Sequence, residues 1–98
     1  MKLIVAVVRP FTIDRILVAF EGIENFPGMT VTDTLGFGQG LKTPGDEINP
    51  FKPNKWLEIV SPEEMVDEII SVLRVSAHTG KKGDGFIIVL PIEKSVLI

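Results

Sequence analysis

A strand–helix–strand pattern that occurs twice, once in each half of the chain, constrains the fold most strongly. Runs of β-branched and apolar residues are typical of strands, and a helical period separates them in pairs. The expected strands are Leu3–Val8, Met29–Leu35, Lys55–Val60 and Phe86–Leu90. The repeat predicts an α+β fold, a ferredoxin-like βαββαβ sandwich in which two helices cover one face of an antiparallel sheet. With 98 residues, the chain is expected to form a single domain over residues 1–98.

Both expected helices carry apolar residues at the spacing of one helix face. The first is expected to have Thr12 as its N-cap and to end at Gly22. The second is expected to begin with Ser61 at the N-cap and Glu64 closing a capping box. The residues expected to face the core are Ile13, Ile16, Leu17 and Phe20 in the first helix and Met65, Val66, Ile69, Ile70 and Leu73 in the second. A short edge strand at Ser95–Ile98 is a further expectation.

Two helices leave the second face of such a sheet uncovered. Hydrophobic residues make up 45% of the chain and the mean hydropathy is +0.33, which is high for a small monomer. A domain of this size buries only a modest fraction of its own surface. The apolar excess therefore predicts a homotrimer that buries the uncovered face between its subunits.

Composition excludes several classes of function. The formal net charge of −3 argues against broad nucleic-acid binding, which needs a basic surface. The absence of cysteine excludes disulfides, thiolate metal sites and cysteine nucleophiles. No apolar run approaches the roughly 18 residues of a membrane span. Because Arg9-Pro10 follows the first apolar run and no small-residue cleavage site appears, we expect a buried strand in a cytoplasmic protein that does not insert into membranes.

A glycine-rich segment, Thr79-Gly80-Lys81-Lys82-Gly83-Asp84-Gly85, stands directly before the last expected strand. Successive N–H groups in such a loop can form a nest for an anion, and lysines add positive charge, so one interpretation is a phosphate-bearing ligand. The other is a tight connection in which Gly80 caps the helix and Gly83–Gly85 turns the chain. Glycine-rich loops are a weak signal by themselves, so the segment alone leaves both interpretations open.

A long segment without periodicity, residues 36–54, separates the two halves. It contains four glycines and three prolines. Structureless segments of this length in a small domain are usually functional or mobile. We therefore expect a flexible loop that contacts a partner.

Six motifs fall along the whole chain in an order and at a spacing that resemble the PII signal-transduction family, the nitrogen regulatory proteins P-II. They are Arg9-Pro10-Phe11, Gly28-Met29-Thr30-Val31-Thr32, Gly36-Phe37-Gly38, Leu57-Glu58-Ile59-Val60, the segment Thr79–Gly85 and Leu90-Pro91-Ile92-Glu93. The resemblance implies a regulatory trimer that is not an enzyme. It implies three clefts between subunits that each bind an adenine nucleotide. It also implies a loop, the T-loop at about 36–54, that controls a transporter or enzyme in nitrogen or carbon metabolism.

The resemblance also implies which residues bind the nucleotide, and it favours the phosphate interpretation of the glycine-rich segment. The implied residues are Val7, Thr30, Gly36, Phe37, Gly38, Glu58, Val60, Thr79, Lys81, Lys82, Gly83, Asp84 and Gly85. Main-chain N–H groups at Gly83–Gly85 would donate hydrogen bonds to phosphate oxygens, while the strand residues would lie near the adenine. No catalytic residue and no metal ligand is implied.

The chain departs from the family pattern at positions that usually carry cations. Phe86, Gln39, Asn54 and Leu97 stand where the family usually has basic residues, and the sequence given ends at Ile98 before a further arginine. A charge-assisted hydrogen bond contributes roughly 1.5–3 kcal/mol. We therefore expect a divergent member with a shortened T-loop and a truncated C-terminus that binds ADP or AMP at least as well as ATP, with no metal required. A small anion such as bicarbonate or 2-oxoglutarate is a candidate second effector.

Two other functions stay open at this point. One is a small acylphosphatase-like enzyme, although Pro10-Phe11 after Arg9 leaves no glycine-rich phosphate loop there. The other is a trimeric interaction scaffold that has lost nucleotide binding. The only histidine, His78, is expected to be a solvated residue at a helix end, and Trp56 is expected at a subunit interface or stacked on a ligand.

Overall fold

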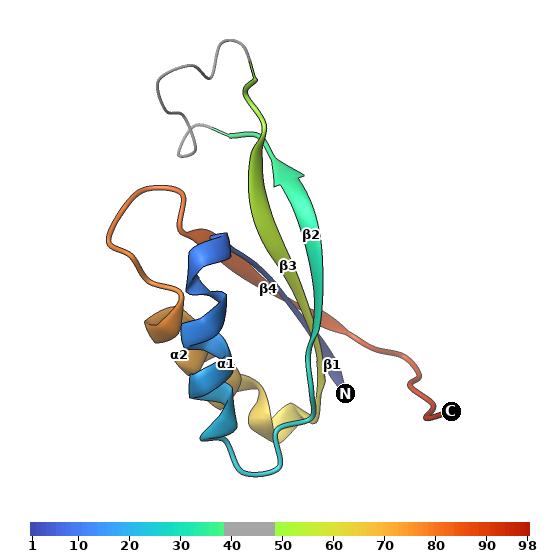
Figure 1. Cartoon of the computed structure of the whole chain (residues 1–98). Helices are drawn as coiled ribbons and strands as arrows, with labels where there is room; N and C mark the ends of the chain where they lie inside the picture. The colour runs from blue at the N-terminus through green and yellow to red at the C-terminus, as the bar shows by residue number, and fades with distance from the viewer. Residues whose placement is uncertain (39–48) are drawn as a thin grey trace.

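The computed structural model of the chain describes residues 1–38 and 49–98, and it has the expected order of strands and helices (Figure 1). The strands are β1 (Lys2–Val8), β2 (Thr30–Gly36), β3 (Lys52–Ser61) and β4 (Gly85–Pro91). The helices are α1 (Ile13–Glu21) and α2 (Val66–Ser76), each preceded by a 3-10 turn, η1 (Pro10–Thr12) and η3 (Glu63–Met65). No helix in these described ranges is long and apolar enough to cross a membrane.

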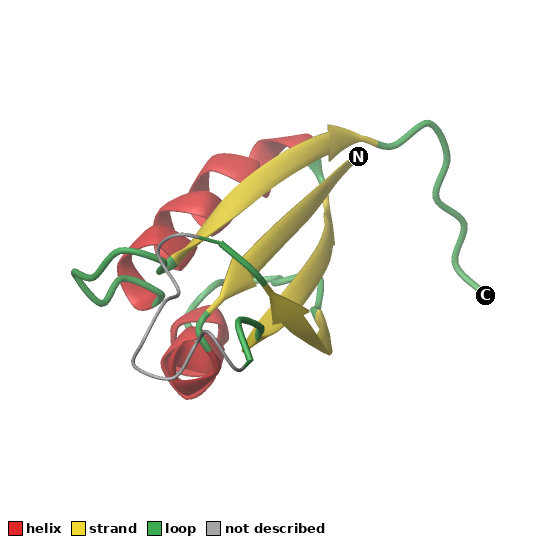
Figure 2. Ribbon diagram, turned by 90° about the horizontal axis from the view of Figure 1, so that it is seen from above, coloured by secondary structure: helices red, strands yellow, loops and turns green. Residues whose placement is uncertain are grey.

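The four strands form one antiparallel sheet in the order β2-β3-β1-β4. Both helices lie on the same side of this sheet, which Figure 2 shows from above. The arrangement confirms the predicted ferredoxin-like βαββαβ sandwich. Strand β1 is central, and β2 and β4 are the two edges of the sheet.

The core lies between the sheet and the helices, and it follows the two periodicities of the sequence. Alternate residues of β1 and β3 point at the helices, and one stripe of each helix points back. The buried residues of this core include Ile4, Ala6 and Val8 of β1, Leu57 and Ile59 of β3, Ile16 and Phe20 of α1, and Val66, Ile69 and Leu73 of α2. Of the residues expected to face inward, Ile13, Met65 and Ile70 pack at the margin of the core. Leu17 is exposed.

The opposite face of the sheet has no covering layer in the single chain. Directly opposed residues of an antiparallel pair share a face, so Val7 of β1 stands beside Trp56 of β3 and Phe86 of β4. The neighbouring rows on this face are Val5 beside Glu58 and Ile88, and Leu3 beside Val60 and Leu90. Every β4 residue of these rows is exposed. The uncovered apolar face inferred from the sequence is thus present.

The expected start of the second helix is wrong, whereas the first helix has its expected N-cap residue, Thr12, without a side-chain capping bond. Ser61 is the last residue of β3, paired with Lys2, and its hydroxyl donates to the Pro62 carbonyl, so it caps no helix. Helix α2 begins only after the η3 turn, and its N-cap residue makes no side-chain capping bond. Thr12 does precede α1, but its hydroxyl donates to the Arg9 carbonyl at 2.8 Å and stabilises the η1 turn instead.

Strand ends also differ from the expectation. Strand β3 begins at Lys52 rather than Lys55, and β2 ends at Gly36 rather than Leu35. The start of β3 and the end of β2 pair with each other beyond the end of β1, which makes both strands longer than expected. The expected strand at Ser95–Ile98 is wrong. Those residues form no regular structure, and the C-terminal segment leads away from the body of the chain, so it has no neighbouring strand to pair with (Figures 1 and 2).

Shortening one side chain on each face of α2 should distinguish the buried face from the exposed face by the effect on stability. Ile69 is fully buried whereas Val75 is 79% exposed. We expect Ile69→Ala to lower the free energy of unfolding by about 2–5 kcal/mol, because it leaves a cavity in the core. Val75→Ala is the control and should change it by less than about 0.5 kcal/mol. Urea unfolding at one protein concentration measures both, and equal losses would contradict this core.

Candidate functional site

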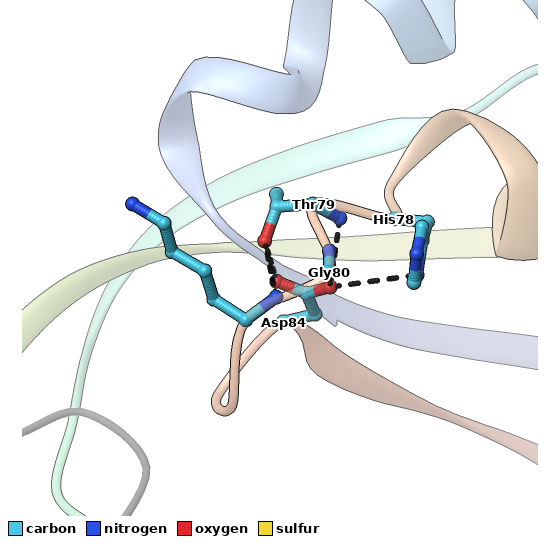
Figure 3. Close-up of polar contacts among 5 residues, drawn as sticks. His78, Thr79, Gly80 and Asp84 are labelled. Atoms are coloured by element: carbon cyan, nitrogen blue, oxygen red, sulfur yellow. Dashed lines mark hydrogen bonds and ion pairs between the residues drawn. The ribbon is translucent and has the colours of Figure 1, made fainter.

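The glycine-rich segment forms a loop between α2 and β4 that is organised around the carboxylate of Asp84 (Figure 3). Oδ2 of Asp84 accepts hydrogen bonds from the main-chain N–H groups of Thr79 at 2.7 Å and Gly80 at 3.2 Å. Oδ1 accepts a hydrogen bond from the Thr79 hydroxyl. His78 Nδ1 lies 3.7 Å from Oδ2. The carboxylate therefore ties the two ends of the loop together.

These contacts favour the ionised form of Asp84. The hydrogen bond from the Thr79 hydroxyl, then that from the Thr79 N–H, lowers the pKa of the carboxyl below its usual value. The Gly80 N–H and His78 act in the same direction, against the opposing effect of partial burial. Asp84 is thus a carboxylate at neutral pH.

The remaining main-chain donors of the loop divide into two groups. The Lys81 N–H donates to the Thr79 hydroxyl at 3.3 Å. No acceptor within the described ranges takes the N–H groups of Lys82, Gly83 or Asp84. Gly80 and Gly83 adopt φ of 83° and 84°, a conformation that favours glycine and turns the chain. The side chains of Lys81 and Lys82 are exposed on the same loop.

Gly85 brings the end of this loop against the central strand. It stands opposite Val8 in the β1–β4 ladder, with φ of 123°. A Cβ atom at this position would lie 1.8 Å from the carbonyl oxygen of Val7. Only glycine fits both the conformation and the space, so the loop and Val7 are held in contact.

The other residues implied as nucleotide-binding lie on different parts of the sheet. Thr30 of β2 is paired with Glu58 of β3 near the middle of the sheet, and Val60 stands further along, opposite Leu3. The Glu58 carboxylate already accepts a hydrogen bond of 2.9 Å from Trp56 Nε1. Gly36 lies at the outer end of β2, opposite Lys52 and beyond the end of β1.

One chain therefore brings Val7 and the glycine-rich loop together but not the remaining residues. The loop precedes edge strand β4, whereas Thr30 and Gly36 belong to the opposite edge strand β2. Two strands stand between these edges, a separation of about 14 Å at the usual spacing of strands. Within one chain, a site that includes both sets would have to span the width of the sheet.

Two aromatic rings lie at the base of the expected partner loop. Phe37 and Phe51 contact each other with ring centroids 6.0 Å apart and an angle of 52° between the planes. Both side chains are exposed. Residues 39–48, which include Gln39 and most of the expected loop, lie outside the described residues, and the expected mobility of the loop falls there as well.

Two features of the site have no clear signal in the sequence. A groove of about 740 Å³ runs between α2 and β4 and is lined by Val7, Arg74, His78, Asp84 and Phe86 among others. At the end of β1, the Nη1 atom of Arg9 is buried and has no hydrogen-bond partner among the described residues.

No set of three potential metal ligands occurs among the described residues.

Comparison with known proteins shows which family the chain belongs to. A family model described as P-II, Nitrogen regulatory protein P-II, matches residues 1–98. The chain belongs to the P-II family. It is 36% identical to the nitrogen regulatory protein P-II of Haemophilus influenzae and 34% identical to that of Azospirillum brasilense, in each case over the whole of this chain and 91% of the relative. It is also 34% identical to nitrogen regulatory protein P-II 1 of Escherichia coli K12, with the same coverage.

Membership in the P-II family confirms the recognition made from the sequence motifs and assigns a regulatory, signalling class of function. P-II proteins are regulators rather than enzymes, and as a family they form trimers that bind adenine nucleotides and target proteins. Which of these properties this P-II protein uses depends on its own residues.

Substitution of Gly85 tests the contact between the loop and β1. We expect Gly85→Ala to lower the free energy of unfolding by at least about 2 kcal/mol, because the added Cβ clashes with the Val7 carbonyl and φ is unfavourable for alanine. Gly38→Ala is the control, since no atom lies within 4 Å of its added Cβ. Urea unfolding measures both, and a Gly85→Ala protein as stable as the wild type would contradict the close contact.

Proposed function

We propose that this P-II protein is a homotrimer that senses an adenine nucleotide in clefts between its subunits. It then controls a transporter or an enzyme through the loop at 36–54. The observation that carries the proposal is the glycine-rich loop. It presents three main-chain N–H groups that have no partner among the described residues, beside two exposed lysines and Val7. Such a row of donors suits the phosphate oxygens of a ligand.

The trimer is supported by the sheet. Its uncovered face is apolar along β1 and β4, and an exposed apolar patch of this kind is normally an interaction surface. The family's nucleotide-binding residues also lie on two different edges of the sheet. Contact between two unlike edges is heterologous, and such contacts close into rings when the rotation between subunits allows it. A cleft between neighbouring subunits would then hold residues of both edges.

The choice of nucleotide follows from charge. Phe86 is the second residue of β4 and has an exposed ring beside the loop, and Asn54 is buried in β3, so neither offers a cation to an outer phosphate. Leu97 lies in the exposed C-terminal segment. Main-chain donors and the two lysines remain, which suits one or two phosphates better than three. We therefore propose ADP or AMP as the preferred ligand and no requirement for a metal.

A second, small anion is supported by Arg9. A buried guanidinium nitrogen without an acceptor is costly, so a ligand that supplies an oxygen there would bind favourably. Bicarbonate or a small carboxylate has the required chemistry and would link the protein to carbon or nitrogen metabolism.

Calorimetric titration with AMP, ADP and ATP tests the nucleotide proposal. We expect ADP or AMP to bind at least as tightly as ATP and magnesium to change the affinities little. Phe86→Lys restores a cation and should tighten ATP binding by about tenfold, whereas Phe86→Leu should not. Because Phe86 lies on the uncovered sheet face, the affinities are compared only if light scattering gives both variants the mass of the wild type. ATP binding more than tenfold tighter than ADP in the wild type, about 1.4 kcal/mol, would overturn the preference. Binding of none of the three would leave only the trimeric scaffold.

Light scattering tests the trimer. The wild type should have three times the chain mass of 10.8 kDa. Ile88→Glu places a charge on the uncovered sheet face and should shift the protein to the monomer, because a buried unpaired carboxylate is strongly unfavourable. Val18→Glu is the control, on the exposed side of α1, and should stay trimeric. A stable wild-type monomer at micromolar concentration would contradict the proposed trimer.

A further inference from the structure

The Asp84 carboxylate occupies the position that an anion would take in its own loop. Its two oxygens receive the Thr79 N–H, the Thr79 hydroxyl and the Gly80 N–H, and His78 stands 3.7 Å away on the side of α2 (Figure 3). A row of main-chain donors is the usual setting of a bound anion. Here the chain supplies that anion itself.

This internal anion divides the donors of the loop. The N–H groups of residues 79–81 are used within the loop, two by the Asp84 carboxylate and one by the Thr79 hydroxyl that it orients. The next three N–H groups, of residues 82–84, have no partner among the described residues. The first set holds the turn in shape, and the second set is left for a ligand.

We propose that Asp84 is a positioning residue that fixes the glycine-rich loop in the conformation that binds phosphate, and that its carboxylate does not touch the nucleotide. The proposal rests on the proposed function, since it takes a nucleotide phosphate as the ligand of residues 82–84. It changes the role of Thr79 as well, which becomes the partner of Asp84 rather than a ligand contact.

The proposal predicts that neutralising Asp84 changes the phosphate affinity in the opposite direction to the one that charge alone would give. Asp84 carries a negative charge next to a site for an anion, so its neutralisation alone would tighten phosphate binding. If Asp84 acts by holding the loop, its neutralisation weakens binding instead. Nearby charged or titratable groups are His78, Arg74 on the preceding turn of α2, and the lysines of the loop, and none of them is changed in the test.

The test compares Asp84→Asn, Thr79→Val and Thr79→Ser. Asp84→Asn removes the charge at nearly constant shape. Thr79→Val removes the hydroxyl without changing any charge, and Thr79→Ser retains it as the matched control. Two quantities are measured in each trimeric protein: the affinity for ADP by calorimetry, and the amide hydrogen exchange of Thr79 (or its replacement) and Gly80 by NMR without ligand.

We expect Asp84→Asn and Thr79→Val to weaken ADP binding by about tenfold and to speed exchange of both amides by a similar factor. Thr79→Ser should behave as the wild type. Unchanged or tighter ADP binding by Asp84→Asn would overturn the proposal. Weaker binding with unchanged amide exchange would also overturn it, because Asp84 would then contact the ligand directly. If the wild type binds no nucleotide, the proposed function fails, and the positioning of a phosphate site fails with it. The exchange contrast would still show whether Asp84 holds the loop.

Discussion

The pairing of β1 on both of its sides is the constraint on which the rest of the structure depends. Strand β1 is hydrogen-bonded over Lys2–Val8 to β3 on one side and to β4 on the other, so it joins the two β-α-β halves of the chain. Its residues Ile4 and Ala6 are fully buried beneath the helices. Complete burial of a side chain the size of Ile4 contributes about 1.5–3 kcal/mol. The same ladder places Gly85 beside Val7, and thereby decides where the glycine-rich loop meets the sheet.

The loop shows how the proposed anion site could form with few cations. Asp84 satisfies the donors that shape the turn, and the donors left over are main-chain N–H groups whose positions are set by that turn. Fixed dipoles of this kind attract phosphate oxygens without carrying a net charge. They suit the phosphates nearest the nucleoside, whereas a longer phosphate chain needs side-chain cations as well. The glycines of the loop and the small number of cations around it would therefore both suit a ligand with one or two phosphates.

The two edges of the sheet carry different parts of the proposed nucleotide site. Thr30 and Gly36 lie on β2, and the glycine-rich loop leads into β4. Strand order in this fold keeps those edges apart in any single chain. The uncovered apolar face lies between them, so the surface that would drive assembly and the surfaces that would form the cleft are continuous. Assembly and ligand binding are coupled by geometry in such an arrangement.

The sequence by itself determined the four strands of the sheet, most of the inward-facing helix residues and the family, because these depend on local periodicity and on motif spacing. Tertiary structure decided the rest. Ser61 has the local pattern of a helix cap. It pairs with Lys2 instead, because β3 extends to Ser61 and the Ser61 backbone belongs to the ladder between β1 and β3. Asp84 stands in a motif associated with ligand binding, yet its carboxylate is bonded to Thr79. Competition for hydrogen-bond partners is settled by which groups the fold brings within reach, and no local pattern in the sequence contains that information.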